Sequence, residues 1–415
     1  MKSIFTLLTL LPLWCGVHAQ HIRLLQPQFH TVRLRVNGDF RLPPVIRLGS
    51  DDRLELSFDG LTHDIHRYRY ILTHCDAEGT PSDLSETEYL QGFNDNLIET
   101  ADPSVNTTLP YTHYSLMLPN RDVSPTLSGN YRITVYDEDE GRDHPAFTAC
   151  FKIVEPAVQI AARVSSDTDI DRNKTHQQVS FTLFHKGYSI RHPGQELKVY
   201  VYQNNRTDNR AGGLTPSFVG ADQLRYEHNR ALIFEAGNEY RRFETVNLHA
   251  PMRGVDHISY HAPYYHATLP IDLPRLLNYS YDQDQNGRFL IRYDRAVESS
   301  DIEADYLLTH FAFRPSAPLG AGSFYLDGDL TNHTFTEANR LVYNADEDWY
   351  ECTLLLKQGA YNYQYLYLAP EATAGTTSRS EGNFHETENE YLILVYHRPF
   401  GERYDRLIGV QRIGN

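Results

Sequence analysis

Charged and apolar side chains alternate in two segments that we expect to be neighbouring strands. Residues 67–72, RYRYIL, alternate arginine with tyrosine and end in two aliphatic residues. Residues 131–136, YRITVY, alternate in the same way. A period of two places every second side chain on the same face, so each segment predicts a strand with one buried face.

A third strand is expected over residues 147–154, FTACFKIV, where it would close the same sheet. The acidic run at 137–141, DEDEG, indicates the hairpin turn that precedes it. Gly129 stands two residues before Tyr131. This spacing resembles the corner of immunoglobulin-like sandwiches, where the tyrosine hydroxyl bonds back to nearby backbone.

Similar patterns recur along the rest of the chain, separated by turn residues, and long amphipathic helical stretches are nearly absent. The fold class that we predict is all-β, with tandem immunoglobulin-like β-sandwich domains. The 415 residues are too many for one core. We place an N-terminal domain at 20–155, a middle β domain at 156–298 and a C-terminal domain at 299–415. The strands expected beyond the first domain are 179–185, 196–203, 224–234, 243–248, 257–260, 289–294 and 305–313.

A long polar connection, residues 76–120, separates the first two predicted strands. Compact domains rarely hold a connection of this length without a function or a structure of its own. This one mixes large apolar residues with turn formers. It either packs over its own sandwich or presents a surface to a partner, and for the second case we expect Tyr89, Gln91 and Phe93 to lie at the contact.

Five stretches of the sequence carry a resemblance to a known family. They are THCDAEG at 73–79, PSDLSETEYLQGFNDNLI at 81–98, YTHYSLMLPN at 111–120, LSGNYRITVYDEDE at 127–140 and GNFHETENEYLILVYHRPFGERYDRLIG at 382–409. These stretches resemble the type IX secretion system plug protein family of Bacteroidota-type bacteria. The resemblance implies a periplasmic protein that closes the inner mouth of the large outer-membrane translocon barrel when no cargo is passing.

The first 19 residues have the pattern of a secretory signal peptide. Lys2 provides the positive start, residues 4–14 form a short apolar core, and 17–19, VHA, is a small-x-small cleavage site. No other apolar run approaches the roughly 20 residues that a membrane helix needs. The formal charge of −16 argues against binding to nucleic acid or to anionic lipid. We therefore expect an exported protein that has no membrane span.

Three cysteines follow the predicted signal peptide, namely Cys75, Cys150 and Cys352. An oxidising periplasm permits a disulfide. Cys75 and Cys150 fall in the same predicted domain, and a bond between them would contribute on the order of 4 kcal/mol where geometry permits. The alternative is three buried free thiols. No CxxC pair indicates zinc.

The C-terminal domain contains an aromatic stripe, Tyr361, Tyr363 and Tyr365, two residues after Gly359. Together with Trp349 and the leucines between, this spacing resembles the early-set immunoglobulin-like modules of the glycogen-binding and isoamylase N-terminal type. The resemblance implies an early-set fold for 299–415. The family's sugar-contact positions have no residue-by-residue match here, so the stripe is read as core or as a sugar platform.

Two patterns suggest metal ligands but lack essential parts. His261 and His266 have no nearby carboxylate or cysteine, whereas zinc needs three or four converging ligands. Residues 282–287, DQDQNG, match the first half of a calcium loop, yet its twelfth position is Tyr293 in place of glutamate. We expect a solvated acidic turn there, with calcium binding as the open alternative, and no cofactor.

No arrangement suited to catalysis stands out in the sequence: there is no GxSxG turn, and no cysteine lies beside a clear base. We therefore predict a non-enzymatic periplasmic plug or accessory subunit that occludes the periplasmic opening of the type IX translocon. Its partner would be the outer-membrane barrel protein, and no small-molecule substrate is expected. The alternative is an exported carbohydrate-binding protein that uses the C-terminal module, and a cargo of the same secretion system is a third possibility.

Overall fold

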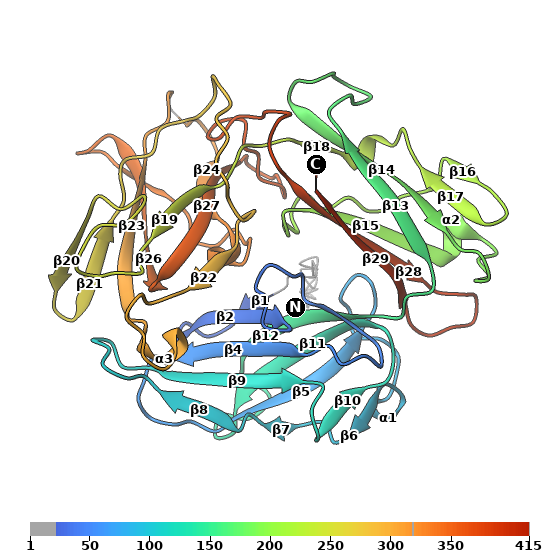
Figure 1. The fold of residues 1–415 in the computed structure, drawn as a ribbon, viewed down its shortest axis with the longest axis horizontal. Coiled ribbons are helices and arrows are strands. Elements are labelled where there is room, and N and C mark those ends of the chain that lie inside the picture. Colours follow the sequence, from blue (N-terminus) through green and yellow to red (C-terminus); the bar gives the residue numbers. More distant parts are fainter. Residues whose placement is uncertain (1–21, 318, 415) are drawn as a thin grey trace, which may run out of the picture.

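The computed structural model describes residues 22–317 and 319–414. Regular structure in this part of the chain is nearly all strand, with only short helices, so the predicted all-β class is confirmed. The strands form three β-sandwiches arranged around a common centre (Figure 1). The predicted signal peptide, residues 1–19, lies outside the described residues.

The first sandwich contains twelve strands and one short helix. They are β1 (Ile22–Leu24), β2 (Phe29–Val36), β3 (Val45–Arg47), β4 (Leu54–Gly60), β5 (Tyr68–Cys75), α1 (Glu86–Tyr89), β6 (Leu90–Gly92), β7 (Asn96–Leu97), β8 (Thr100–Pro103), β9 (Thr112–Leu118), β10 (Val123–Pro125), β11 (Gly129–Asp137) and β12 (Pro145–Val154). One sheet has the order β1-β12-β11-β5-β7, with β3 parallel to β12. The other has the order β2-β4-β9-β8, and β6 pairs with β10.

The alternating residues of the first sandwich form its core. Tyr131, Ile133 and Val135 are buried on β11, and they pack with the inner residues of the opposite sheet. The Tyr131 hydroxyl donates a hydrogen bond to the carbonyl oxygen of Leu127 at 2.9 Å. The predicted tyrosine corner is therefore present, and it fixes the start of β11.

Much of the connection at 76–120 is sheet. Strand β9 pairs along its whole length with β4, and β8 pairs with β9. Tyr114, Leu116 and Leu118 alternate along β9 and are buried in the core. The expected long insertion loop therefore supplies half of the second sheet, because a sandwich needs a second apolar face to cover the first.

The second sandwich is built from two separate parts of the chain. Its elements are β13 (Gln159–Ser165), β14 (His176–Phe184), α2 (Pro193–Glu196), β15 (Leu197–Gln203), β16 (Phe218–Val219), β17 (Gln223–Tyr226), η1 (Arg230–Leu232), β18 (Ile233–Glu235), β28 (Glu390–His397) and β29 (Arg406–Gly414). One sheet has the order β13-β14-β17-β16, with β18 also on β14, and the other has the order β15-β28-β29.

The third sandwich is inserted between β18 and β28. Its elements are β19 (Arg241–Glu244), β20 (His257–His261), β21 (Tyr264–Thr268), β22 (Phe289–Ile291), α3 (Ser300–Glu303), β23 (Tyr306–Phe313), β24 (Ser323–Asp327), η2 (Asp329–Thr331), β25 (Val342–Asn344), β26 (Trp349–Lys357) and β27 (Gly359–Leu368). Its sheets have the orders β19-β27-β22, with β24 on β27, and β20-β21-β23-β26-β25.

The strand pairing crosses the division expected at residue 298. Strands β19 and β22 before this point pair with β27 after it, so the division falls inside the third sandwich. Strands β28 and β29, expected in the C-terminal domain, instead extend the sheet of β15. Local patterns could not reveal this arrangement, because the pairing joins strands on either side of a whole sandwich.

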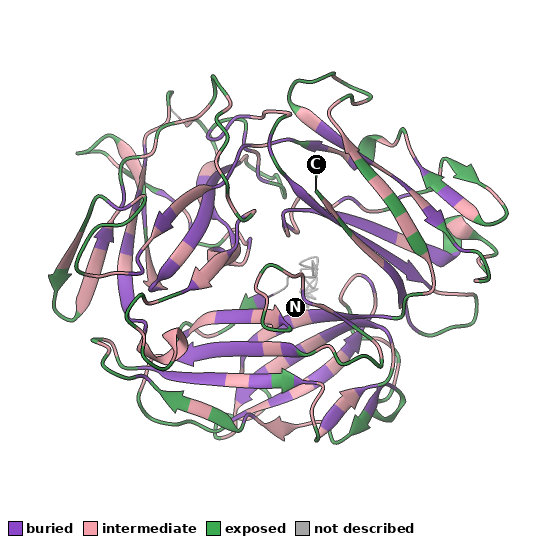
Figure 2. Cartoon of the chain, in the orientation of Figure 1, coloured by how far each residue is buried: buried purple, intermediate pink, exposed green. Residues whose placement is uncertain are grey.

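Buried residues lie on the inner faces of the sheets and also between sandwiches (Figure 2). The sheet β15-β28-β29 uses one face for the core of the second sandwich and the other for a contact with the first. Tyr200, Leu394 and Leu407 from this sheet pack with Ala77 and Val154 of the first sandwich. The sandwiches are therefore joined by apolar contact as well as by the charges described next.

Candidate functional site: the junctions around the central cavity

The junction of the first and third sandwiches contains a fully buried ion pair. Lys357 Nζ lies 2.6 Å from Asp59 Oδ2, and both side chains are 0% exposed. His113 Nδ1 lies 2.6 Å from the other oxygen of Asp59, and the Tyr306 hydroxyl donates to Asp59 at 2.7 Å. Asp59 and His113 belong to β4 and β9, whereas Lys357 and Tyr306 belong to β26 and β23. One carboxylate therefore collects donors from both sandwiches.

The charges at this junction stabilise one another. Burial by itself would raise the pKa of Asp59, but Lys357 and His113 together hold it below its usual value. The Lys357 ammonium also donates to the carbonyl of Asp301 at 2.6 Å and lies 4.0 Å from the centroid of the Tyr111 ring. Charges removed this completely from water are stable only with such partners.

Two more contacts extend the same junction. Arg33 on β2 lies 2.6 Å from the carboxylate of Asp301 on α3. Thr108 donates its backbone N–H and its hydroxyl to Asp305 at 2.7 and 2.6 Å. Arg33 holds the pKa of Asp301 well below its usual range, although burial opposes this shift. The first sandwich therefore binds the segment that leads into β23 at two points, Asp301 and Asp305.

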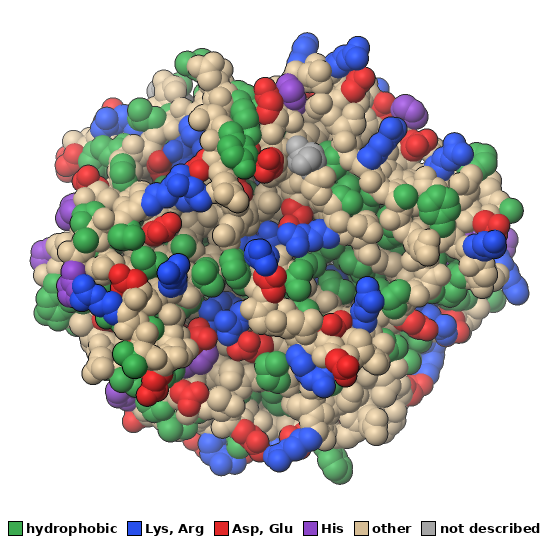
Figure 3. Space-filling view, in the orientation of Figure 1, with side chains coloured by type: hydrophobic (Ala, Val, Ile, Leu, Met, Phe, Trp, Pro, Cys, Tyr) green, Lys and Arg blue, Asp and Glu red, His purple; other side chains and the backbone are tan. Residues whose placement is uncertain are grey.

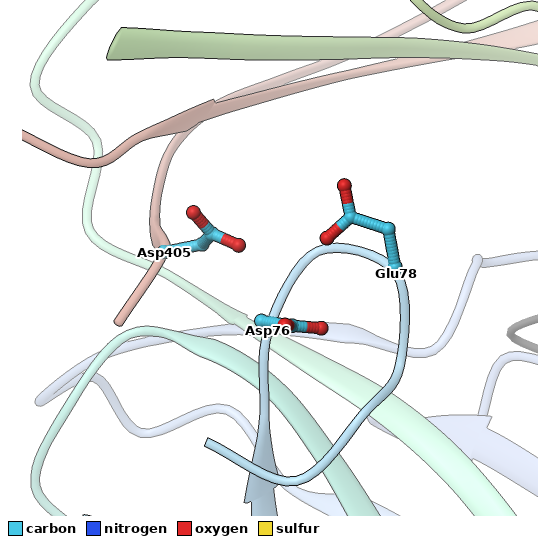
Figure 4. A group of neighbouring side chains, drawn as sticks. All are labelled: Asp76, Glu78 and Asp405. Atoms are coloured by element: carbon cyan, nitrogen blue, oxygen red, sulfur yellow. The ribbon is translucent and has the colours of Figure 1, made fainter. Parts of the chain in front are cut away.

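The junction of the first and second sandwiches carries three carboxylates (Figure 4). Asp76 and Glu78 lie on the loop after β5, and Asp405 precedes β29; one oxygen of each lies within 4.8 Å of the others. Lys198 Nζ on β15 lies 2.9 Å from Glu78 and 3.0 Å from Asp405. Arg398 Nε lies 2.8 Å from Asp405. Lys198 and Arg398 therefore already pair with carboxylates of this cluster, and we interpret the cluster as an ion-pair link between the two sandwiches.

The junction of the second and third sandwiches is centred on His333. Its Nδ1 and Nε2 atoms each lie 2.9 Å from a carboxylate, of Asp327 and Asp329 respectively. Burial by itself would lower the pKa of His333, but the two carboxylates raise it to about 10. From the second sandwich, Asn205 donates to Asp329 at 3.3 Å, and Arg206 donates to the carbonyl of Gly375 at 2.8 Å.

The three residues expected at a partner contact do not share one environment. Tyr89 is only 5% exposed and packs in the core, where its hydroxyl donates to the carbonyl of Leu72. Gln91 is exposed, and Phe93 is 84% exposed. Gly92 between them has φ +99°, and a Cβ atom there would lie 2.1 Å from the carbonyl oxygen of Asp122. This glycine therefore fixes a tight turn that directs Phe93 outward. The buried Tyr89 side chain anchors the start of the same turn in the core.

The possible disulfide between Cys75 and Cys150 is not formed; all three cysteines of the described residues are free thiols, the alternative that the sequence left open. Cys75 on β5 pairs with Asn130, and Cys150 on β12 pairs with Arg132, so β11 lies between them. Strands two positions apart are separated by roughly 9.6 Å, which exceeds the limit of about 7 Å between bridged Cα atoms.

The thiols give a direct chemical test. We expect the purified protein, unfolded without reductant, to take up iodoacetamide at Cys75, Cys150 and Cys352. Burial raises the pKa of Cys150 to about 11 and that of Cys352 to about 12. In the folded protein at pH 8, labelling of Cys150 and Cys352 is then expected to be on the order of 100-fold slower than that of free cysteine. Peptide mass spectrometry measures both, and increased labelling after reduction would contradict free thiols.

The patterns that suggested metal ligands have other partners. His266 Nδ1 lies 2.8 Å from His310 Nε2, and the two rings stack. Asp284 accepts the backbone N–H groups of Tyr240 and Asn286, and burial raises its pKa to about 7. Neither pattern belongs to the group of three neighbouring carboxylates described above, which is the one such group found within residues 22–317 and 319–414.

The aromatic stripe on β27 belongs to the core of the third sandwich. Tyr361, Tyr363 and Tyr365 are at most 4% exposed. The hydroxyls of Tyr363 and Tyr365 donate to Asp272 at 2.8 and 2.9 Å. No face of these rings is free to stack on a sugar, so the stripe gives no support to the carbohydrate-binding alternative.

A cavity of about 1040 Å³ opens between the first and third sandwiches. Its walls include β1, the segment 329–339 and the C-terminal half of β26, with Arg23 and Arg132 among the lining residues. Figure 3 shows Lys and Arg side chains near the centre of this face of the molecule, with Asp and Glu side chains beside them. Sequence reasoning missed this cavity and the buried charges. The available signal was Lys357, a charged residue that directly follows the apolar run 354–356.

Comparison with known proteins assigns the first sandwich. Residues 29–155 match the family described as the type 9 secretion system plug protein, first domain. Residues 29–155 are a first domain of the type IX secretion system plug protein family. The resemblance drawn from the sequence motifs is thus confirmed, and the protein has a role associated with type IX secretion. No enzyme family is indicated among these matches.

A solved structure covers nearly the whole plug-family chain. It is the crystal structure of a hypothetical protein from Parabacteroides merdae, with 45% sequence identity and a TM-score of 0.93, over 95% of this chain and 99% of that chain. A second structure, of a putative membrane-anchored protein from Corynebacterium diphtheriae, aligns over 91% and 89% of the two chains with 8% identity and a TM-score of 0.13, too low to bear on the fold. No curated protein matches the chain. Across the described residues, none of the helices is both long and apolar enough to cross a membrane.

Proposed function

We propose that this plug-family protein is a non-enzymatic periplasmic subunit that occludes the periplasmic opening of the type IX translocon. Its partner is then the outer-membrane barrel protein of the translocon, and it needs no cofactor or small-molecule substrate. The observation that carries the proposal is the closed arrangement of three sandwiches, in which every pair is joined by ion pairs or hydrogen bonds of buried or half-buried charged groups.

Occlusion requires a body that keeps its shape when it is pressed against a pore. Apolar packing alone resists compression, and the paired charges add a cost to any sliding of one sandwich over another. Lys357 and Asp59 would become unpaired in a dry environment, which is strongly unfavourable. A plug must also leave the pore when cargo enters. The bound and released states of the protein therefore need similar free energies.

We propose that Gln91 and Phe93 contribute to the contact with the barrel. Phe93 is a large apolar side chain on a turn fixed by Gly92. A preorganised aromatic residue loses little conformational entropy on binding, which is why such residues often dominate interfaces. Tyr89 acts only as a support, since it is buried in its own sandwich.

The test is co-purification from cell envelopes in mild detergent. We expect the wild-type protein to recover the outer-membrane barrel, and Phe93→Asp to reduce recovery by about tenfold, the effect of roughly 1.4 kcal/mol. Phe400→Asp is the matched control, because Phe400 is also exposed but lies on the loop between β28 and β29. Failure to recover any barrel would contradict the proposed partner. Equal recovery with both variants would show that Phe93 does not contribute to the contact.

A further inference from the structure

Strand β26 has an edge that is only partly paired. On one side β23 pairs with β26 from Tyr350 to Lys357. On the other side β25 pairs only with residues 349–351. Within the described parts of the chain, no strand covers residues 352–357 on this second side.

The backbone of this edge offers unused hydrogen-bonding groups. The N–H of Gln358 donates to the carbonyl of Asp305 on the β23 side at 2.8 Å. Because antiparallel pairing alternates, Leu356 and Leu354 also bond toward β23, whereas Thr353 and Leu355 direct their N–H and C=O groups the other way. Among residues 22–317 and 319–414, no strand pairs with these groups of Thr353 and Leu355.

The unpaired edge borders the central cavity of about 1040 Å³. Leu354, Leu355 and Leu356 line it and are half-buried. Strand β1, itself an edge strand, lines the cavity too. Proteins usually protect exposed strand edges with charges, prolines or covering segments, since an open edge invites a further strand. Residues 353–356 carry neither a charge nor a proline.

Two arginines that line the cavity have no carboxylate partner among the described residues, whereas Asp329, which also lines it, is paired with His333. Arg23 and Arg132 line the cavity, and the Arg132 guanidinium lies 3.5 Å from the sulfur of Cys75. Carboxylates of the described chain form ion pairs with many other cations, but none lies within 4.0 Å of either arginine. The environment therefore favours an acidic occupant.

We propose that the cavity binds an extended, acidic polypeptide segment of another protein, which adds as a strand to the free edge of β26. The backbone of the segment pairs with Thr353 and Leu355. Its apolar side chains pack on the leucines, and a carboxylate pairs with Arg23 or Arg132. Pairing along residues 353–357 would take about five residues, or roughly 17 Å of extended chain. This site is independent of the occlusion role and of the Phe93 surface.

The test begins with a phage-displayed library of random dodecapeptides, panned on the full mature protein. We expect binders that alternate apolar residues and contain at least one Asp or Glu. Synthetic peptides should then show dissociation constants on the order of 1–100 μM by fluorescence polarisation. Two peptides, N-methylated at the odd or at the even positions, should differ in binding. One should lose binding and the other should keep it, because only every second peptide N–H group faces β26.

Two variants separate the backbone contribution from the charge. Leu355→Pro removes the outward N–H without removing a bond to β23, and it should weaken binding at least tenfold; Leu355→Val is its matched control and should bind normally. Arg23→Glu with Arg132→Glu should weaken binding of acidic peptides at least tenfold and leave the thermal unfolding midpoint unchanged. A library without binders, binding that both variants leave intact, or a dimer that Leu355→Pro abolishes would overturn the proposal, the last by assigning the edge to a second copy.

Discussion

Replacing Lys357 by methionine is expected to lower the free energy of unfolding by about 3–5 kcal/mol. The substitution leaves the Asp59 carboxylate buried between two sandwiches without the cation 2.6 Å away. The remaining donors, His113 and Tyr306, cannot supply the lost charge in full. Asp59 should respond by taking up a proton, so the loss should be larger at pH 8 than at pH 5.

Urea unfolding followed by tryptophan fluorescence measures this loss. The control is the double variant Lys357→Met with Asp59→Leu, which removes both charges and should recover most of the stability, because a buried ion pair is often no more stable than apolar residues of similar size. A loss below about 1 kcal/mol in the single variant would show that the pair does not hold the junction.

Replacing His333 by glutamine is expected to lower the free energy of unfolding by about 3–5 kcal/mol at pH 6. The imidazole sits between Asp327 and Asp329 and is 3% exposed. Glutamine keeps a similar size but carries no charge, so the two carboxylates would face each other without the cation. The same change should loosen the junction with the second sandwich, where Asn205 binds Asp329.

The effect of this substitution should depend on pH in a defined direction. The folded-state pKa of His333 is raised to about 10, whereas an unfolded histidine titrates near about 6.5. The stabilisation from His333 is therefore complete below pH 6.5 and is lost as the pH rises through 10. Urea unfolding of wild type and variant at pH 6, 8 and 10 should show a difference that shrinks steadily, and a constant difference would contradict the assigned charge.

Each strand that local patterns in the sequence predicted overlaps a strand of the structure. The expected strands at 179–185, 196–203, 257–260 and 305–313 correspond to β14, β15, β20 and β23, with ends that differ by only a few residues. The expected strand at 224–234 is divided by η1 into β17 and β18. Alternation succeeds because one face of each strand is buried whatever sheet it joins. Pairing partners escape this reasoning, as β15 with β28 shows.

The candidate site could be predicted only in part. Gly92 and Phe93 stood in a segment singled out from the sequence, and the structure explains how the glycine turns the aromatic ring outward. Tyr89 belongs to the same apolar segment but is buried. The sequence could not show this, because a turn of mixed residues does not reveal which side chain faces inward. The sequence also left open whether Cys75 and Cys150 are bonded, since two strands of one sheet need not be neighbours.

The sequence by itself determined the all-β class, the tyrosine corner and the family, because each depends on residues close together in the chain. Only the tertiary structure decided that the third sandwich is inserted into the second, that Asp59 meets Lys357 across 298 positions, and that one edge of β26 stays open. The physical reason is the distance along the chain between the interacting residues. Strand formation depends on neighbouring side chains, whereas buried charges and sheet edges find their partners only when distant segments pack together and exclude water.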